Sequence, residues 1–214
     1  LNEKQLKREN IEYAKTYVHP LDHAGYYPGA TQMSLKMLFD SDTGKIYGAQ
    51  AVGHHGVEKR IDVIATAQRL GATVFDLEKL ELTYAPPYSS AKDPVNMLGF
   101  TAANILRGDT AVFHYQDVAA LDLDRDMLVD VRSPEEFELG SIPGAINIPL
   151  DDLRDRLTEL PASLKIFLFC QVGLRGYLAS RILIQNGYGE VYNLSGGYKL
   201  YNTIKLDQIG RAHV

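Results

Sequence analysis

The stretch KIFLFCQVGLRG at residues 165–176 decides the fold of the second half of the chain and contains its only cysteine, Cys170. The unbroken apolar run at 166–169 is typical of a strand that is buried on both faces of a parallel sheet. Two glycines follow, and the apolar spacing of residues 174–186, which stops before Gly187, predicts a short loop and then a helix. Cys170 is therefore expected at the carboxyl end of a core strand.

The loop after this strand favours a reactive cysteine over an inert one. Successive backbone N–H groups and the positive end of a helix dipole would point at whatever the thiol carries, and Arg175 adds a fixed positive charge. All three effects favour a thiolate or a bound anion over a neutral thiol. A lone cysteine at a strand end is more often a small buried hydrophobe, but such a residue needs no glycine-rich loop and no arginine. We therefore predict that Cys170 is reactive.

CQVGLR, from Cys170 to Arg175, resembles the active-site loop of rhodanese-type sulfurtransferases, and VDVRSPEEFELGSIPGAINIP at residues 129–149 resembles the other signature of that family. The likeness covers residues 111–204. It implies that Cys170 accepts a sulfane sulfur as a persulfide, with Arg175 nearby. The persulfide loop would then consist of Gln171, Val172, Gly173, Leu174 and Gly176.

Residues beside the predicted persulfide loop have more than one interpretation. Asp130 and Arg132 fall at the end of a core strand, where they support the cysteine loop or form a structural ion pair. Ser133 and Glu136 predict only the start of a helix. Tyr201 stands where many rhodaneses carry a tryptophan, and the chain contains no tryptophan. The resemblance therefore says more about the chemistry than about the substrate.

Composition narrows the class of protein. The chain has 214 residues, 45% of them hydrophobic, which predicts globular material of one or two domains. A net charge of −5, with no Lys/Arg stripe, gives no reason to expect nucleic acid. No apolar run approaches a membrane span, and one cysteine excludes an internal disulfide framework, so we expect a cytoplasmic protein without a membrane partner. The first residue is Leu1 rather than methionine, and we expect a fragment or a processed product.

The first half of the chain, residues 1–108, predicts an α+β domain. Strands precede most of the helices there, which favours a largely antiparallel sheet, with a hairpin turn that holds Gly44. The strands are expected at 11–18, 33–40 and 45–53, and the helices at 2–9, 57–70, 74–80 and 94–108. Asp93 is the expected N-cap of the last helix, with Pro94 at its first position.

The second half, residues 109–214, predicts an α/β domain with a parallel sheet and helices on both faces. Short strands and helices alternate after a boundary at 108–116. The strands are expected at 127–131, 145–147, 166–169 and 191–194, and the helices at 134–139, 153–160 and 174–186. Ligand sites in such sheets lie beyond the carboxyl ends of the strands, where Cys170 falls.

Two loops of the first half are rich in tyrosine. GYYPG contains Tyr26 and Tyr27, and TYAPPY contains Tyr84 and Tyr88. Phenol rings in loops stiffened by proline offer a large binding surface at low entropic cost. Packing of these loops onto the sheet is an equally good interpretation.

Several segments resemble the carboxyl-terminal interface domain of flavin-dependent pyridine-nucleotide disulfide reductases, in particular the coenzyme A-disulfide reductase branch, some members of which end in a rhodanese domain. They are GYYPGATQMSLKMLFD, KIYGAQAVG, GVEKRIDVIATA and LELTYAPPYSSAKDPVNMLG. The resemblance implies a homodimer through residues 1–108 that brings Tyr26 and Tyr84 to the partner's redox site, with Tyr27 and Tyr88 as alternates. A phenol there can donate a proton to a leaving thiolate.

Dinucleotide-binding motifs are missing from the sequence. NGYGEV at residues 186–191 has two glycines at the right spacing, but Tyr192 stands in place of the third and the segment follows a predicted helix. The redox cysteine of the reductases is also missing, because Cys170 belongs to the rhodanese loop. We expect no FAD or NAD(P)H on this chain alone. The resemblance implies FAD, NAD(P)H and coenzyme A for the intact reductase, with its flavin and nucleotide domains upstream.

Histidines give no metal prediction. His19, Asp22 and His23 are spaced like ligands, but they lie in a proline-containing loop without a third strong ligand. His54 and His55 are adjacent, so on a strand their side chains would face opposite ways. We therefore predict no metal site.

The expected function is that of the carboxyl-terminal part of a coenzyme A-disulfide, persulfide or polysulfide reductase, with sulfane sulfur carried on Cys170. One alternative is a free-standing sulfurtransferase in which residues 1–108 only dimerise. Another is a non-catalytic interaction module. The sequence leaves the sulfur donor, the acceptor and the choice between NADH and NADPH open.

Overall fold

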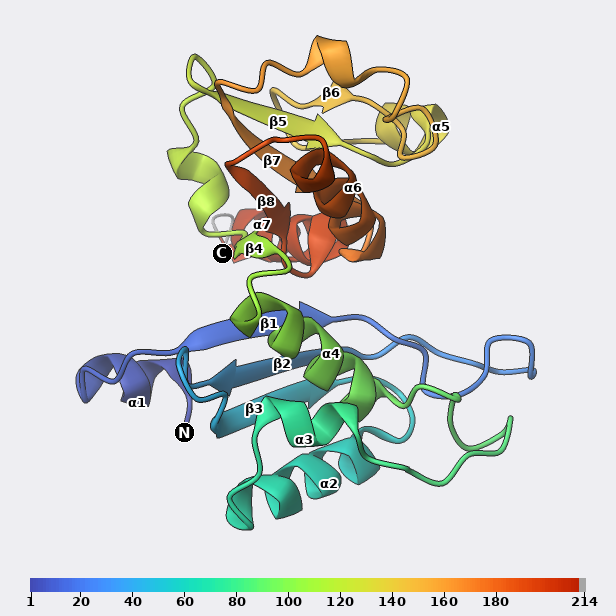
Figure 1. The fold of residues 1–214 in the computed structure, drawn as a ribbon. Helices are drawn as coiled ribbons and strands as arrows, with labels where there is room; N and C mark the ends of the chain where they lie inside the picture. Colours follow the sequence, from blue (N-terminus) through green and yellow to red (C-terminus); the bar gives the residue numbers. More distant parts are fainter. Residues whose placement is uncertain (212–214) are drawn as a thin grey trace. The chain divides into compact units, whose positions relative to one another are not determined.

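The computed structural model describes residues 1–211, and the chain forms two compact units, Leu1–Gly108 and Asp109–Val214 (Figure 1). The first unit contains a three-stranded antiparallel sheet in the order β1-β2-β3. Its strands are β1 (Ala14–Val18), β2 (Ser34–Phe39) and β3 (Ile46–Val52). The antiparallel sheet and its hairpin are confirmed, and Gly44 takes a φ of 74° in the turn.

The predicted helices of the first unit are also confirmed. They are α1 (Glu3–Arg8), α2 (Val57–Arg69), α3 (Val74–Glu78) and α4 (Pro94–Leu106). Helix α4 begins where the sequence predicts, because the Asp93 side chain accepts a hydrogen bond from the backbone N–H of Val95 at 2.9 Å and Pro94 needs no partner for its nitrogen.

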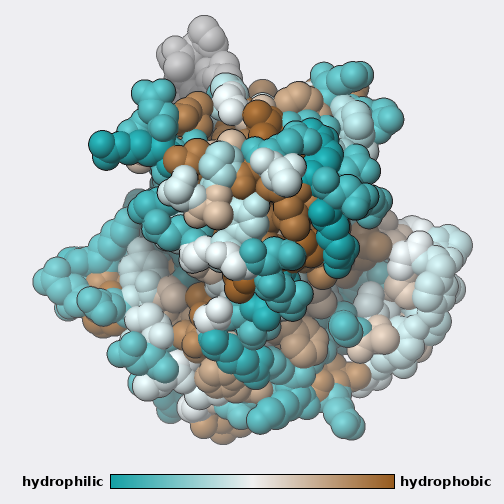
Figure 2. Space-filling model, turned by 45° about the horizontal axis from the view of Figure 1, so that its top comes forward, coloured by the Kyte–Doolittle hydropathy of each residue, from teal (hydrophilic) through white to brown (hydrophobic). Residues whose placement is uncertain are grey.

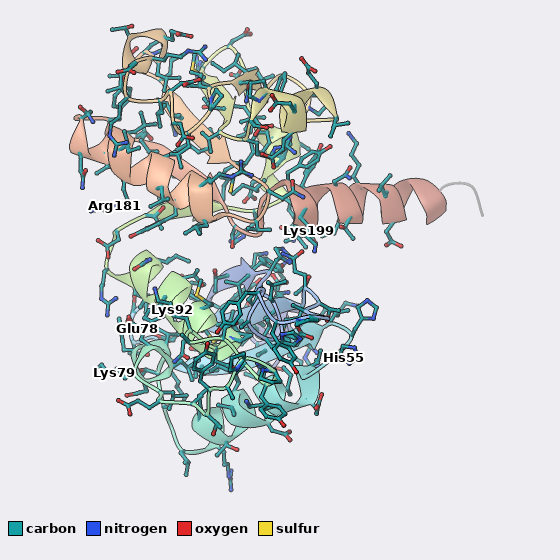
Figure 3. The ribbon with its side chains drawn as sticks, turned by 90° about the vertical axis from the view of Figure 1, so that its right-hand side faces the viewer. His55, Glu78, Lys79, Lys92, Arg181 and Lys199 are labelled. Atoms are coloured by element: carbon teal, nitrogen blue, oxygen red, sulfur yellow. The ribbon has the colours of Figure 1, made fainter. Side chains whose placement is uncertain are left out.

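The core of the first unit lies between its sheet and helices α2, α3 and α4. Buried apolar side chains of β2 pack there against the helices: Leu35, Met37 and Phe39 meet Ile64, Leu77 and Leu98. Gly99 lets α3 and α4 come close, since a Cβ at this position would lie 2.6 Å from the backbone nitrogen of Glu78. Glu78, on α3 in Figure 3, also accepts hydrogen bonds of 2.6 and 3.0 Å from Arg107 at the end of α4.

The second unit contains a five-stranded parallel sheet in the order β4-β8-β7-β5-β6. Its strands are β4 (Ala111–Phe113), β5 (Asp126–Asp130), β6 (Ile146–Asn147), β7 (Lys165–Phe169) and β8 (Val191–Leu194). The parallel sheet is confirmed. Strand β4 was not predicted; it lies within the expected boundary segment at 108–116 and pairs with β8.

The helices of this unit are α5 (Pro134–Glu138), α6 (Leu174–Gln185) and α7 (Gly197–Arg211), with the 3-10 turns η1 (Asp117–Ala120) and η2 (Leu157–Glu159). The predicted helix at 153–160 is wrong, because only η2 forms there. Pro161 disfavours helical geometry in the residue before it, and turns suffice to bury Leu153 and Leu160. Helix α7 was not predicted, because two glycines open it and glycine is more typical of loops.

Helices cover both faces of the parallel sheet, as predicted. Alternate residues of β7 point to opposite faces. On one face Ile166 and Leu168 pack against Leu183 of α6. On the other, Phe167 and Phe169 belong to a second cluster with Tyr198 and Tyr201 of α7.

Hydrophilic residues cover much of the face drawn in Figure 2, with hydrophobic residues between them. Within residues 1–211, no helix combines the length and the apolar character that crossing a membrane requires.

Candidate functional site

Cys170 directly follows β7 and is buried, with 1% of its surface exposed. The backbone N–H of Gly173 donates a hydrogen bond to its Sγ atom at 3.2 Å. Gly173 itself has a φ of 111°, a conformation that glycine adopts far more readily than other residues. The loop therefore turns back on the sulfur atom directly before α6 begins, as the sequence analysis expects.

The start of helix α7 packs against the cysteine loop through two backbone hydrogen bonds. The N–H of Tyr198 donates to the carbonyl of Cys170 at 2.8 Å, and the N–H of Lys199, a residue on the first turn of α7 in Figure 3, donates to the carbonyl of Gln171 at 3.0 Å. In a trans peptide the N–H points opposite to the carbonyl. The N–H groups of Gln171 and Val172 therefore point away from α7.

Gly197 makes this contact between loop and helix possible. Its φ is 60°, and a Cβ there would lie 2.5 Å from the carbonyl oxygen of Cys170 and 2.7 Å from that of Gln171. Any side chain at this position would push α7 away from the loop. Sequence reasoning assigned this glycine no role in the site.

Asn193 of β8 holds the cysteine loop through its side-chain amide. Its Nδ2 donates a hydrogen bond of 3.0 Å to the carbonyl of Gly173. Its Oδ1 is buried without a hydrogen-bond partner, against Gly176, where a Cβ would lie 2.1 Å away. Gly176 is thus required for close packing of α6 on β8. Sequence reasoning missed Asn193, whose only signal is an amide within an apolar strand.

Arg175 is held by Glu136 of α5, 39 positions earlier in the chain. Its two terminal nitrogens donate to the two carboxylate oxygens at 2.6 and 2.8 Å. Arg175 is the main cause that lowers the pKa of Glu136 to about 2, and the pKa of Arg175 is raised, first by Glu136 and less by Cys170. Glu136 caps α5 through Ser133, as predicted. The expectation that it marks only a helix start is corrected by its pairing with Arg175.

Asp130 and Arg132 form a buried ion pair, with Nη2 and Oδ2 2.6 Å apart. Arg132 also reaches the loop, because its Nη1 lies 3.4 Å from Oε1 of Gln171 and its guanidinium carbon lies 4.2 Å from the ring centre of Tyr198. The structure therefore contains both features that the sequence left open, the structural pair and the contact with the cysteine loop. Tyr201 packs beside Tyr198, with ring centres 6.4 Å apart.

The two predicted tyrosines of the first unit meet. The hydroxyl oxygens of Tyr26 and Tyr84 lie 2.5 Å apart, and both rings are exposed. This hydrogen bond is the main cause that raises the pKa of Tyr84 above its usual value. Tyr27 instead contacts His23 edge to face, with ring centres 5.7 Å apart. Tyr88 is 70% exposed.

A buried network that sequence reasoning missed holds the two tyrosine loops. Arg60 of α2 is 2% exposed and pairs with Asp93, Nη2 to Oδ2 3.0 Å. The same nitrogen donates to the carbonyl of Asp22 in the first loop at 2.7 Å. Ser89 of the second loop donates to Asp93 at 2.7 Å, and its carbonyl accepts from the N–H of Ala24 at 2.9 Å. An arginine on the inner face of a predicted helix was the available signal.

The remaining histidine and glycine motifs have structural explanations. Asp22 accepts hydrogen bonds from the N–H and the hydroxyl of Thr31, at 2.8 and 2.9 Å, and from the N–H of His23 at 3.0 Å, so its carboxylate shapes the loop. Within residues 1–211, no three acidic, histidine or cysteine side chains are grouped to hold a metal ion. His54 and His55 are exposed in a turn after β3.

The glycine-containing segment at 186–191 closes α6 and leads into β8. Gly187 takes a φ of 88° there, after the last turn of the helix. A dinucleotide-binding turn opens a helix after a strand, which is the opposite order. This segment therefore does not fit a nucleotide cofactor.

Comparison with protein families identifies both units. Residues 1–94 match the pyridine nucleotide-disulphide oxidoreductase dimerisation domain, and residues 115–203 match the rhodanese-like domain. The chain joins a reductase dimerisation domain to a rhodanese-like domain. The expected resemblance to the carboxyl-terminal portion of a reductase with a rhodanese domain is thereby confirmed. The domain limits 1–108 and 109–214 stay a prediction, because the matched ranges are narrower.

Solved structures contain the same pair of domains. A reduced Bacillus anthracis protein named CoADR-RHD is 52% identical, with a TM-score of 0.94 over 97% of this chain and 37% of that one. A NAD-dependent persulfide reductase from A. fulgidus is 37% identical, with a TM-score of 0.83 over 94% of this chain and 36% of that one. The reductase dimerisation domain and the rhodanese-like domain thus correspond to about a third of these proteins.

Curated relatives match a smaller part of the chain. A coenzyme A disulfide reductase of Staphylococcus epidermidis is 45% identical over 94 residues, which are 44% of this chain and 22% of that protein. The corresponding protein of Staphylococcus haemolyticus is 42% identical over 96 residues, 45% of this chain and 22% of that protein. The chain therefore spans about a fifth of the length of these relatives.

Proposed function

We propose that Cys170 carries sulfane sulfur as a persulfide within an intact FAD- and NAD(P)H-dependent reductase of coenzyme A disulfides, persulfides or polysulfides. The observation that carries the proposal is the cysteine loop. The sulfur atom of Cys170 accepts the Gly173 N–H, and the N–H groups of Gln171 and Val172 point away from α7. An outer sulfur atom bound to Cys170 would carry negative charge, which such N–H groups stabilise.

The transfer step needs no oxidant. The thiolate of Cys170 attacks the outer sulfur of a persulfide R–S–SH, a new S–S bond forms, and the old one breaks to release the thiolate R–S⁻. Cys170 then carries –S–SH. A second thiol, such as that of coenzyme A, takes this outer sulfur by the same exchange and regenerates the Cys170 thiolate.

The dimerisation domain would form a homodimer through residues 1–108 and bring Tyr26 and Tyr84 to the redox site of the partner subunit. Two exposed phenols that share a hydrogen bond can donate a proton to a thiolate as it leaves a disulfide or persulfide. The names of the relatives, coenzyme A disulfide reductase and NAD-dependent persulfide reductase, support the reductase function. They favour it over a free-standing sulfurtransferase and over an interaction module.

FAD and NAD(P)H would bind to flavin and nucleotide domains upstream of the dimerisation domain. When bound, they would supply the electrons that reduce the disulfide or persulfide. The segment at 186–191 does not fit either cofactor, so no residue of this chain is assigned to them.

Intact-mass measurement tests the sulfur-carrier step. The chain is incubated with glutathione persulfide, the donor is removed, and the mass is recorded before and after treatment with dithiothreitol. We expect the gain of a single sulfur atom that dithiothreitol reverses and that Cys170→Ser abolishes. A folded wild-type chain that gains no sulfur from any donor would contradict the proposal.

A further inference from the structure

Both arginines near Cys170 are paired with carboxylates. The guanidinium of Arg175 faces Glu136 through two hydrogen bonds of 2.6 and 2.8 Å. Arg132 faces Asp130 in the same two-pronged manner, with Nε 2.9 Å from Oδ1 and Nη2 2.6 Å from Oδ2. Each pair has no net charge. The two guanidinium groups therefore add little net positive charge around the sulfur atom.

The two pairs differ in exposure. Side chains of the Asp130–Arg132 pair are 0% and 3% exposed, so that pair belongs to the interior. In the Glu136–Arg175 pair, the side chains are 33% and 35% exposed. Arg175 also interacts with the sulfur of Cys170, which adds to the rise in its pKa. An incoming sulfur donor would therefore meet Glu136 and Arg175, and the carboxylate of Glu136 is as accessible as the guanidinium.

Donors of sulfane sulfur differ in charge at the reacting atoms. Thiosulfate is a dianion whose charge is shared by its outer sulfur and its oxygens, and its approach to a thiolate is favoured by unpaired cations. An organic persulfide carries at most one charge on its sulfur pair. A carboxylate beside the entry opposes the dianion more strongly, and it also occupies the two N–H groups of Arg175 that would otherwise bind the oxygens of thiosulfate.

We propose that Glu136 determines donor specificity by neutralising Arg175, so that Cys170 takes sulfur from organic persulfides in preference to the thiosulfate dianion. The inference rests on the proposed sulfur-carrier function and names its donor. With a persulfide, the S–S bond breaks and a thiolate leaves. With thiosulfate, the Cys170 thiolate would attack the sulfane sulfur, the S–S bond would break and sulfite would leave. Both steps are balanced without an oxidant.

Glu136→Gln is the variant that removes the negative charge of residue 136 while keeping the fold around it. Glutamine at this position still accepts from the Ser133 N–H and so keeps the capping box. It removes the negative charge and frees Arg175. Glu159→Gln is the matched control, since Glu159 forms the same two-pronged pair with Arg156, at 2.7 and 2.8 Å, without involving the cysteine loop. Glu136→Asp keeps the charge and serves as the conservative variant.

The measurement is the initial rate at which the full chain gains sulfur, followed by intact mass, with glutathione persulfide and thiosulfate in separate reactions. The wild-type chain should load faster from the persulfide. In Glu136→Gln the ratio of thiosulfate rate to persulfide rate should rise about fivefold or more, the effect of one partly exposed charge. Glu159→Gln should keep the wild-type ratio, and Glu136→Asp should stay close to it.

An unchanged ratio in a Glu136→Gln variant that still folds would overturn the inference. So would a wild-type chain that loads equally fast from both donors. If Glu136→Gln does not fold, Arg175→Gln gives the second test, because it removes the cation and leaves the carboxylate, and the ratio should then fall below that of the wild type. Failure of the wild-type chain to load from either donor would instead contradict the sulfur-carrier function itself.

Discussion

The hydroxyl oxygens of Tyr26 and Tyr84 lie 2.5 Å apart, although 58 positions separate the two residues in the chain. Two loops without regular structure carry them. The loops are joined near their bases by the hydrogen bond from the Ala24 N–H to the Ser89 carbonyl and by Arg60, which binds both. The geometry of the tyrosine pair is therefore set by a buried polar network rather than by the loops alone.

Tyr26→Phe should lower the pKa of Tyr84 toward the usual value for tyrosine, because the Tyr26 hydroxyl is the main cause of its rise. NMR of ring-labelled tyrosine, followed against pH, measures this directly. Tyr27→Phe is the control, since Tyr27 contacts His23 rather than Tyr84. An identical Tyr84 titration in Tyr26→Phe and wild type would show that the two hydroxyls do not interact in solution.

Arg60→Met should destabilise the dimerisation domain by roughly 3–5 kcal/mol, because it leaves the Asp93 carboxylate buried and unpaired. Arg107→Met is the matched control. Its pair with Glu78 has the same two-pronged geometry, but the arginine is 46% exposed, and the expected loss is about 1 kcal/mol or less. Urea unfolding measures both. Equal losses would contradict the structural role of the Arg60 network.

Asn193→Ala should slow both the alkylation of Cys170 by iodoacetamide and its loading with sulfur. The variant loses the hydrogen bond that holds the Gly173 carbonyl, so the Gly173 N–H no longer points steadily at the sulfur. We expect several-fold slower reactions, corresponding to about 1 kcal/mol for one hydrogen bond.

Asn186→Ala is the control for this experiment. Asn186 also donates its amide to a backbone carbonyl, that of Ile182 at 2.8 Å, but it does so at the far end of α6. It should reduce stability without changing the reactivity of Cys170. If both variants react like the wild type, Asn193 does not position the loop.

Gly197→Ala should abolish sulfur loading and destabilise the rhodanese-like domain. Its Cβ would lie 2.5 Å from the Cys170 carbonyl oxygen, so α7 or the loop must move. Gly187→Ala separates this clash from the cost of positive φ, because Gly187 has a φ of 88° with no atom within 4 Å of an added Cβ. The control should lose about 1 kcal/mol and keep its activity. Calorimetry and intact mass measure the two effects, and an active Gly197→Ala variant would refute the packing argument.

The pairing of Glu136 with Arg175 should make stability depend on pH in acid. The folded-state pKa of Glu136 is lowered from 4.5 to about 2, so the stabilisation is fully present above pH 4.5 and is lost as the pH falls toward 2. The difference in unfolding free energy between wild type and Glu136→Gln should therefore shrink between about pH 6 and pH 3. Chemical denaturation at the two pH values measures it, and a constant difference would exclude the pairing.

Sequence reasoning predicted most of the secondary structure because the relevant signals are local. The apolar run of β7 and the glycine loop before α6 were read correctly, as was the cap of α4 at Asp93. It failed at 153–160 and at α7. At 153–160 the leucines have helical spacing, but they lie in turns. At α7 two glycines made the sequence look like a loop, although the helix that starts there binds the cysteine loop.

The residues of the candidate site likewise fall into those that the sequence reveals and those that only the structure reveals. Cys170, Arg175, Tyr26 and Tyr84 stand out from their immediate neighbours, since each lies in or directly after a loop whose glycines or prolines signal a fixed conformation. Glu136, Asn193 and Arg60 carry no such signal. Each acts on a residue far away in the chain, and local periodicity contains no information about such contacts.

By itself the sequence determined the order of strands and helices, the two domain classes and the position of Cys170 at the end of a core strand, because backbone periodicity, capping residues and glycine positions act over a few residues. Only the tertiary structure decided which charges face the sulfur. Strand β5 lies beside β7 with Asp130 opposite Phe169, so the segments that follow the two strands emerge at one edge of the sheet. Arg132 and Glu136 reach the cysteine loop for that reason, and strand order is a property of the whole fold.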